Sequence, residues 1–507
     1  MTNAPKEGAT AIEHYDVLII GAGLSGIGAG HAVQTHCKGK SYAILEGRGV
    51  IGGTWDLFRY PGVRSDTDMY TLGYAFRPWT EPHSMANGAS ILQYVRATAA
   101  EFGIDRHIRF NHRVQNASWS TDEARWTVDA LLVSEASSVQ SVQYTCNFLY
   151  LCGGYYDYDE GFTPDFAGRE AFQGQIVHPQ FWPQSLDYAD KQVVIVGSGA
   201  TAVTLVPSMS DKAAHVTMLQ RSPSYVVSLP SVDGLANSLH RWLPTKLAHR
   251  LARAKSVAFA VAFFQLCRRK PELAKKILRG GVAKSLPAAF DLDTHFKPRY
   301  EPWDERVCFV RDGDLFKAVS AGRASILTDT IKRFTPDGVL LASGQSIKAD
   351  IVVTATGLKL KACAGVRFEV DGRGVDLGKT YAYQGLMLSG VPNLAFCVGY
   401  TNASWTLRAD LTSRYVTRLI NYMSGKGYQA CVPTCDESSM KPEPLIGLRS
   451  GYVMRSVANF PKQGAEVPWR MAQNYYFDLL KMRFRSIVDP HLIFSRPRAA
   501  QVTRSPL

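Results

Sequence analysis

The chain has 507 residues, of which 46% are hydrophobic and 20% are charged. This length allows two or three domains with large apolar cores, and the composition is that of an ordinary globular protein. A net charge of +13 would suggest a nucleic-acid-binding protein if the charge were spread over the chain, but it is concentrated in one segment. Twelve Lys or Arg and one acidic residue lie between Arg241 and Lys284, and the rest of the chain is almost balanced. We therefore expect no nucleic-acid partner.

Nine cysteines, an odd number without a paired framework, indicate a reducing cytoplasm. Cys431 and Cys435 are the closest pair, and nothing nearby completes a zinc site, so we expect no metal. The first fourteen residues lack a charged start followed by an apolar core, which predicts no signal peptide and a cytoplasmic protein.

The first expected element is an apolar strand over Tyr15–Ile20, followed by a glycine-rich turn and a helix. In such a unit the first glycine permits the turn, the second lets the backbone approach a pyrophosphate, and the third lets the helix pack on the strand. Free N–H groups at the helix N-terminus then hold the pyrophosphate. We expect this dinucleotide loop to comprise Gly21, Gly23, Leu24, Ser25 and Gly26.

The next apolar run ends at Glu46, at the distance where an acidic side chain binds ribose hydroxyls. A carboxylate there would repel a 2′-phosphate. The alternative is a glycine-rich turn followed by an unrelated surface glutamate. No C-x-x-C or C-x-x-x-x-C pair follows the loop, which argues against a flavin disulfide reductase.

A second unit begins with the apolar run Gln192–Val196, and the strand after its helix ends just before Arg221. A guanidinium at this position can bind a 2′-phosphate bidentately, which favours NADPH here. The alternative is a solvated arginine at a strand end. The second loop comprises Gly197, Ser198, Gly199, Ala200, Thr201 and Ala202, with Ala202 in place of the third glycine.

Between the two loops stands the pattern F-x-G-x-x-x-H-x-x-x-W-P, formed by Phe172, Gly174, His178, Trp182 and Pro183. This arrangement resembles the fingerprint of type I Baeyer–Villiger monooxygenases. The resemblance implies an α/β fold of two Rossmann-like domains, with the NADP domain inserted in the FAD domain and a helical insert of its own. It also implies FAD on the first loop, NADPH on the second, and insertion of one oxygen atom of O2 into a ketone to give an ester.

Residues 52–66 resemble a second motif of this family, G-G-x-W followed by Y-P-G-x-x-x-D. The resemblance places Thr54, Trp55 and Asp66 at the flavin. Two later stretches, 350–357 and 398–405, resemble the return to the flavin domain and a helix N-terminus directed at the flavin. Further cofactor contacts expected from the resemblance are Val114, Thr356 and Asn402.

The chemistry of this family needs a permanent positive charge, because the attacking flavin C4a-peroxide and the tetrahedral intermediate are both anionic. The family takes an arginine from the segment after its helical insert, which here makes Arg306 the expected catalytic residue, oriented by Asp66. The alternative is a surface arginine paired with Asp304 or Glu305. Many members carry Lys before this arginine, so the Glu305 of this chain makes NADPH preference depend more on Arg221.

The resemblance places His178 in the hinge between domains, where we expect it to control cofactor movement rather than transfer protons. Phe172 and Trp182 are expected to pack this linker. Most of the chain is similar to the mycobacterial branch that activates the thioamide ethionamide, which implies ketone or thioether substrates and some sulfur oxidation. Two alternatives stay open: a flavin-containing heteroatom oxygenase and a catalytically silent redox sensor.

We expect the FAD-binding domain in residues 1–160 and 355–507, a linker with the fingerprint in 161–183, and the NADP-binding domain in 184–354. A helical insert is expected near 230–300. The segment after about residue 425 carries no functional signal.

The basic insert also contains an apolar run, Val257–Phe264, flanked by basic residues. It is too short to span a bilayer, which needs about 20 residues. An ordinary helical insert with a solvated outer face explains the pattern. The alternative hypothesis is peripheral contact of residues 241–284 with an anionic membrane.

Overall fold

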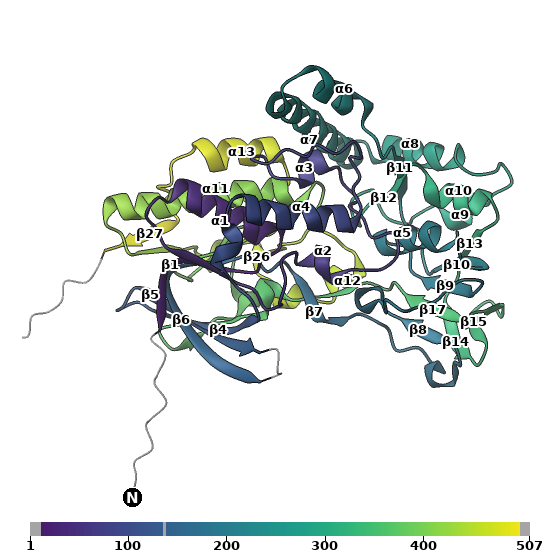
Figure 1. Cartoon of the computed structure of the whole chain (residues 1–507), viewed down its shortest axis with the longest axis horizontal. Helices are drawn as coiled ribbons and strands as arrows, with labels where there is room; N and C mark the ends of the chain where they lie inside the picture. Colours follow the sequence, from purple (N-terminus) through teal and green to yellow (C-terminus); the bar gives the residue numbers. More distant parts are fainter. Residues whose placement is uncertain (1–11, 135–137, 497–507) are drawn as a thin grey trace, which may run out of the picture.

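The computed structural model describes residues 12–134 and 138–496, and its two α/β halves lie side by side in Figure 1. Most of the stretch for which we expect no signal peptide, residues 1–11, lies outside the described residues.

The larger half contains a sheet of nine strands. These strands are β1 (Glu13–Ile20), β2 (Tyr42–Leu45), β3 (Ile108–Arg109), β4 (His112–Ser120), β5 (Arg125–Val133), β6 (Val139–Leu151), β19 (Arg367–Val370), β20 (Arg373–Gly374) and β23 (Leu394–Phe396). Its parallel part has the order β23, β6, β1, β2, β3, and antiparallel β5 and β4 extend it beyond β6. This order is typical of a dinucleotide-binding sheet.

Alternate residues of β1 face opposite sides of this sheet. Val17 and Ile19 pack under helices, whereas Leu18 and Ile20 pack against the antiparallel strands. The covering helices are α1 (Leu24–His36), α4 (Gly88–Glu101) and α11 (Trp405–Lys426). The remaining helices of this half are α2 (Thr54–Leu57), α3 (Met69–Leu72), α12 (Gly451–Met454) and α13 (Tyr475–Phe484).

The smaller half has a fully parallel sheet of five strands, and their order is β13 (Ala324–Thr328), β10 (His215–Gln220), β9 (Gln192–Val196), β17 (Ile351–Thr354), β8 (Gln175–Val177). One face packs on α5 (Ala200–Met209) and α10 (Asp314–Ser320). The other packs on a meander of β14 (Ile331–Thr335), β15 (Gly338–Leu341) and β16 (Ser346–Lys348). Two Rossmann-like units are thus present, and the predicted fold class is confirmed. The expected linker at 161–183 contributes β8 to this sheet.

The chain crosses between the halves twice, and the two crossings pair with each other. Antiparallel β7 (Tyr156–Gly161) and β18 (Leu358–Leu360) form this connection. The other two-stranded pairs are β11 (Val226–Leu229) with β12 (Cys308–Arg311), β21 (Ala382–Tyr383) with β22 (Met387–Leu388), β24 (Ala430–Pro433) with β27 (Leu492–Ser495), and β25 (Glu443–Pro444) with β26 (Lys462–Gln463).

Four helices stand between β11 and β12, namely α6 (Gly234–Trp242), α7 (Thr245–Arg269), α8 (Pro271–Ala283) and α9 (Leu292–His295). The long α7 reaches back over the larger half (Figure 1). Its buried Arg253 donates to the carbonyl oxygens of Tyr70 at 2.9 Å and Gly73 at 2.8 Å, and pairs with Asp410 at 3.0 Å. The insert therefore ties the two halves together. Among the described residues, no helix combines the length and apolar character needed to cross a bilayer.

Candidate active site

The first glycine-rich loop is packed so tightly that backbone atoms occupy the space of two absent Cβ atoms. Gly21 has φ +100°, and a Cβ there would lie 2.9 Å from the Cys152 carbonyl oxygen. A Cβ at Gly26 would lie 1.8 Å from the Gly21 carbonyl oxygen, so α1 packs directly on the turn. Gly23 precedes α1 and no side chain caps that helix, which leaves the N–H groups around Leu24 and Ser25 for a ligand.

Glu46 directly follows β2 and is held beside this loop. Its carboxylate, 6% exposed, accepts hydrogen bonds from the backbone N–H of Ala22 at 2.7 Å and of Arg48 at 2.9 Å. Burial raises the pKa of Glu46, and these hydrogen bonds oppose that rise. The predicted contact Val114 is buried on β4, whose first residue, His112, donates its N–H to the Glu46 carbonyl oxygen at 2.8 Å. Glu46 and Val114 thus share one end of the sheet.

The Gly-Gly-x-Trp segment folds over the first loop. A Cβ at Gly53 would lie 3.0 Å from the Cα of Gly23, and Thr54 and Trp55 begin α2 immediately after it. The next residue, Asp56, is 1% exposed and meets Arg48 at 2.6 Å and Arg59 and Arg96 at 3.1 Å each. This carboxylate, which the sequence analysis did not single out, anchors the segment.

The N-terminus of α11 also points to the first loop. Trp405, the first residue of α11, donates its indole N–H to the Ser25 hydroxyl at 2.7 Å. Asn402 donates through Nδ2 to the Gln473 carbonyl oxygen at 2.9 Å, but its Oδ1 is buried without a hydrogen-bond partner among the described residues. A buried acceptor of this kind calls for a donor that the chain does not supply.

The second loop packs against the residue that follows β17. Gly197 has φ +145°, and a Cβ there would lie 2.3 Å from the carbonyl oxygen of Ala355. α5 follows Gly199 and, like α1, has no side-chain cap at its N-terminus. Around Gly199 a Cβ would meet nothing within 4 Å, so this loop is open where the first is closed. The Ser198 and Ser224 hydroxyls are 2.9 Å apart, and Ala202 is fully buried.

The Tyr-Pro-Gly turn of the larger half packs on α5 of the smaller half. A Cβ at Gly62 would lie 1.8 Å from the Ser208 hydroxyl oxygen, and Gly62 has φ +77°. Burial raises the pKa of Tyr60 to about 12, and a hydrogen bond with Thr201 opposes the rise. The motif expected at the flavin therefore also touches the second nucleotide loop.

Arg306 and Asp66 form an ion pair, with 2.9 Å between Nη2 and Oδ2 and with 32% and 24% of the side chains exposed. The Asp66 charge raises the pKa of Arg306 further, and burial opposes this. Asp304 instead pairs with Arg268 at 2.7 Å. The alternative in which Arg306 pairs with Asp304 is therefore not what the structure shows.

Three tyrosines that no sequence motif predicts lie near this pair. Tyr155, Tyr156 and Tyr452 are close enough to Arg306 to influence its charge. Burial raises the pKa of all three hydroxyls, so they stay protonated at neutral pH. Tyr155 directly precedes β7, Tyr156 is the first residue of β7, and Tyr452 lies on α12, and no spacing in the sequence marks them.

Trp303 holds the segment that leads to Arg306 in an uncommon conformation. It is a buried residue with φ +72°, which costs a bulky side chain on the order of 1 kcal/mol or more. Phe264 and Phe263 of α7 lie against its ring, with centroids 5.9 and 6.4 Å away. The insert thus supports the segment that carries Arg306.

His178 lies between the two crossing strands. Its Nδ1 accepts from the Gln180 backbone N–H at 3.2 Å, so its Nε2 donates to the Gly357 carbonyl oxygen at 3.3 Å. A Cβ at Gly161 would lie 2.2 Å from the ring, and burial lowers the pKa of His178. Thr356 donates to the Phe162 carbonyl oxygen at 2.7 Å across the same crossing. A neutral histidine therefore bridges both connections.

The other fingerprint residues serve packing. The Phe172 ring meets Phe334 at 5.6 Å, and a Cβ at Gly174 would lie 2.5 Å from the Phe172 ring. Trp182 packs against the core of the smaller half, and Pro183 continues the chain towards β9.

Arg221 follows β10 directly and is exposed. Two ionisable groups face it. Burial raises the pKa of Glu305, and the positive charge of Arg221 opposes the rise. Burial and the same charge lower the pKa of Arg455. The Arg455 guanidinium lies 3.4 Å from the Phe162 ring centroid, beside the crossing strands.

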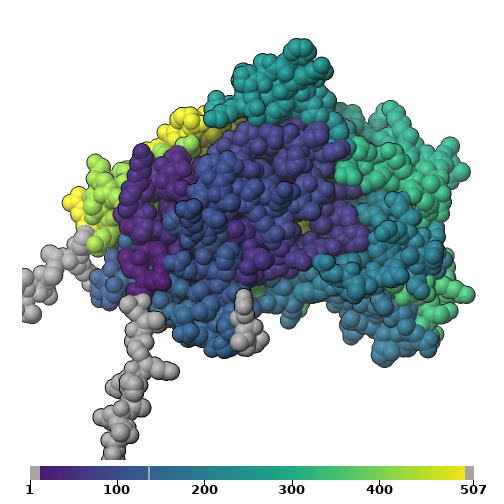
Figure 2. Space-filling model, in the orientation of Figure 1, coloured from purple at the N-terminus to yellow at the C-terminus, as the bar shows by residue number. Residues whose placement is uncertain are grey.

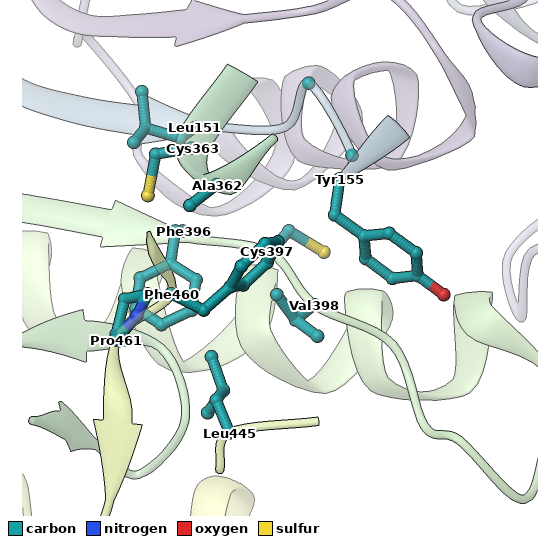
Figure 3. Close-up of a pocket in the computed structure, with 12 residues that line it drawn as sticks. Leu151, Tyr155, Ala362, Cys363, Phe396, Cys397, Val398, Leu445, Phe460 and Pro461 are labelled. Carbon is teal, nitrogen blue, oxygen red and sulfur yellow. The ribbon is translucent and has the colours of Figure 1, made fainter. Parts of the chain in front are cut away.

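Figure 3 shows a cavity beside Tyr155 at the end of β6, whose volume is about 10 Å³. That volume holds about one water molecule, so it is no ketone site. The Tyr155 hydroxyl points away from it (Figure 3). A groove of 660 Å³ lies at the far edge of the large sheet, beside β4 and β19, and none of the predicted site residues line it.

Residues 74–361 match the family of flavin-binding monooxygenase-like proteins, and residues 19–84 match an NAD(P)-binding Rossmann-like domain. The FAD-containing monooxygenase EthA of Mycobacterium tuberculosis is 51% identical over 485 residues, which cover 96% of this chain and 98% of that protein. EthA of Mycolicibacterium smegmatis is 50% identical with the same coverage.

The chain belongs to the flavin-binding monooxygenase-like family. An oxidised steroid monooxygenase bound to NADP has a TM-score of 0.71 at 19% identity, over 95% of this chain and 99% of that one. Cyclohexanone-bound cyclohexanone monooxygenase has a TM-score of 0.68 at 20% identity, over 84% and 90%. At this identity, the likeness to these structures shows the fold. Family membership confirms the predicted class, a flavin-dependent monooxygenase with FAD and NADP(H) as cofactors.

The residues of the first loop fit FAD. Gly21, Gly23 and Gly26 form a cradle that added Cβ atoms would fill, and two uncapped helix N-termini favour a pyrophosphate and a reduced flavin, which carry negative charge. The unpartnered Oδ1 of Asn402 adds an acceptor. When bound, FAD supplies the redox chemistry and the activation of O2 that no side chain provides.

Proposed function

We propose that this protein is a Baeyer–Villiger monooxygenase. It would convert a ketone, O2, NADPH and a proton into an ester, water and NADP+. The observation that carries the proposal is the Arg306–Asp66 ion pair, which has three protonated tyrosines close to it.

Arg306 is the proposed catalytic residue. When an oxygen nucleophile adds to a ketone, negative charge grows on the carbonyl oxygen, and a fixed guanidinium stabilises it without losing a proton. Asp66 holds one side of this guanidinium through Nη2 and thereby sets its direction. Tyr155, Tyr156 and Tyr452 stay protonated and leave the guanidinium charge uncompensated by a second anion.

The cofactor contacts follow the two loops. We propose that FAD binds at Gly21, Gly23, Leu24, Ser25, Gly26, Glu46, Thr54, Trp55, Asp66, Val114, Thr356 and Asn402. NADPH is proposed to bind at Gly197, Ser198, Gly199, Ala200, Thr201, Ala202 and Arg221. The neutral His178 is a positioning residue at the crossing and has no proton-transfer role.

Arg455 supplies a second positive charge for the 2′-phosphate of NADPH. Arg221 and Arg455 are close enough for each to feel the charge of the other, and Glu305 stands where a lysine would otherwise help. A phosphate between two guanidinium groups relieves their mutual repulsion and forms charge-assisted hydrogen bonds.

The test is product analysis by mass spectrometry after FAD-loaded protein is incubated with NADPH, air and an aliphatic methyl ketone that carries a thioether. We expect an ester, with some sulfoxide as a side product. Arg306→Ala should slow ester formation by about 10²–10³-fold, the usual cost of removing one oxyanion-stabilising group. Arg268→Ala is the matched control, because Arg268 supports the same segment through Asp304.

Three outcomes would contradict the proposal. Sulfoxide alone, with the ketone intact, would favour a heteroatom oxygenase. Ester formation that is equally fast in Arg306→Ala would remove the assigned role of Arg306. The absence of NADPH oxidation in air would instead indicate a silent sensor.

We also propose a cytoplasmic location, with peripheral membrane contact through residues 241–284. The concentration of positive charge in this segment supports the contact.

A further inference from the structure

The outer face of α7 carries an apolar stripe that no other described element covers. Leu247, Leu251 and Phe259 are 44%, 43% and 57% exposed. The opposite face is buried against the larger half and includes Ala248, Ala252 and Val257. A helix that packs one face needs a polar outer face to be solvated, and this helix lacks one along the stripe. At helical spacing the stripe consists of Leu247, Leu251, Ala254, Ala258 and Ala262, with Phe259 beside it.

A second apolar stripe lies on α13, near the end of the described chain. It consists of Tyr476, Phe477, Leu480 and Phe484, which are 42%, 42%, 62% and 67% exposed. The inner side of α13 is fixed by the buried Asp478, which pairs with Arg408 at 2.6 Å. α13 is therefore a firmly packed helix that presents its aromatic residues outwards.

The two stripes adjoin. The Tyr476 hydroxyl donates to the carbonyl oxygen of Ala254 at 3.4 Å, and Tyr475 packs with Val257. Figure 2 shows the insert, in teal, beside the yellow C-terminal segment on the upper edge of the molecule. On α6, Leu235 and Trp242 add side chains that are 58% and 77% exposed. Three helices from two distant parts of the chain thus present one apolar surface.

This surface is surrounded by positive charge. α7 has six Lys or Arg and no acidic residue. Arg241, Lys246 and Arg250 are exposed at one end of the α7 stripe, and Arg483 is exposed on α13. Apolar helix faces with basic flanks suit the interface of an anionic bilayer, where the side chains enter the headgroup region and the charges meet lipid phosphates.

We propose that α6, α7 and α13 form a single surface that docks this protein on an anionic lipid bilayer. The inference rests on the membrane contact proposed above for residues 241–284 and extends it to α13. The surface also backs onto the catalytic segment. Phe259 stacks on Phe263 at 6.1 Å, and Phe263 meets Trp303, three residues before Arg306.

The experiment is sedimentation of FAD-loaded full-length protein with phosphatidylcholine vesicles, with and without phosphatidylglycerol. We expect binding only to the anionic vesicles, weakened by salt. The double variant Leu480→Ser, Phe484→Ser on α13 and the double variant Leu247→Ser, Leu251→Ser on α7 should each partition at least about tenfold less, because each removes two large apolar side chains from the interface.

The matched control is Val133→Ser with Val139→Ser. These paired residues are 39% and 60% exposed on the β5–β6 hairpin, on the opposite side of the molecule (Figure 1), and the control should bind as the wild type does. Flavin absorbance and NADPH oxidation should be unchanged in every variant, which verifies folding.

Each contrary outcome has a separate meaning. Loss of binding in the α7 variant but not in the α13 variant would overturn the composite surface and leave the contact of the insert. Wild-type protein that stays in the supernatant would overturn both. Self-association that the helix variants abolish, without vesicle binding, would show that a second copy of the chain covers the surface.

Discussion

The two nucleotide-binding halves share one strand–loop–helix plan but finish it differently. In the larger half, Glu46 is buried and held by two backbone N–H groups, and a Cβ at Gly23 would lie 3.5 Å from the Cα of Gly53, which covers the loop. In the smaller half, the corresponding Arg221 is exposed, and a Cβ at Gly199, the counterpart of Gly23, would meet nothing within 4 Å. We infer that the first loop is preorganised to retain a bound dinucleotide. The second loop is open, as expected for a dinucleotide that enters and leaves during each reaction cycle.

The largest effect is expected for Gly26→Ala, which should destroy the close packing of the first loop. The added Cβ would lie 1.8 Å from the Gly21 carbonyl oxygen, so α1 must move off the loop. We expect purified protein without FAD, measured as flavin absorbance per chain. Gly199→Ala is the control, because its Cβ meets nothing within 4 Å, and it should retain FAD. A Gly26→Ala protein with full flavin content would refute the close-packed description.

Asp66→Asn tests whether the pairing between the halves orients Arg306. The amide keeps the shape but removes the charge that faces Nη2. We expect ester formation to slow by about 10–100-fold, because small misplacements of a catalytic group are costly. The KM for NADPH should stay nearly constant. Asp304→Asn is the control, since Asp304 pairs with Arg268, and an equal loss there would argue for a general disturbance of the segment.

The preference of the second site for NADPH over NADH should depend on the charges around Arg221. Glu305→Lys should lower the KM for NADPH about tenfold relative to NADH, and Arg455→Ala or Arg221→Ala should raise it by a similar factor, as expected for one charge-assisted contact. Steady-state kinetics with both nucleotides measure this ratio. Arg449→Ala removes an exposed arginine from the same segment as Arg455 and should leave the ratio unchanged.

The smallest effect concerns the helix that joins the halves. His249 of α7 is 1% exposed, both ring nitrogens lack partners among the described residues, and burial with the nearby Arg253 lowers its pKa to about 4. Its folded-state pKa lies below the unfolded value of about 6.5, so its contribution to stability is present above that pH and is lost as the pH falls towards 4.

We expect about 2–3 kcal/mol of this pH dependence to disappear in His249→Leu. Urea unfolding of both proteins at neutral pH and near pH 4 measures the difference. Parallel pH dependences for wild type and variant would show that His249 accepts a proton without cost.

Much of the site could be predicted because its demands are local. Gly21 and Gly197 adopt left-handed backbone angles, and such angles leave a glycine signature in the sequence. The pairing of Arg306 with Asp66 was expected only from the family resemblance, and the structure brings the two side chains together across the halves. The roles assigned to them stay predictions.

Other parts of the site could not be predicted from the sequence, because they depend on how the C-terminal segment packs on the rest of the molecule. Tyr452 and Arg455 come from a segment without motif or periodicity, yet they reach the ion pair and Arg221. The apolar stripe on α13 has meaning only beside α7. Contacts between distant segments are set by tertiary packing, which residue spacing does not encode.

The left-handed Trp303 has a consequence for attempts to shorten this protein. An isolated loop would relax from that backbone angle, and the aromatic residues of α7 hold it in place. Although the helical insert looks dispensable for a nucleotide-binding fold, its aromatic residues support the conformation of the segment that ends in Arg306. A minimal version without the insert would therefore lose the support of the segment that carries Arg306.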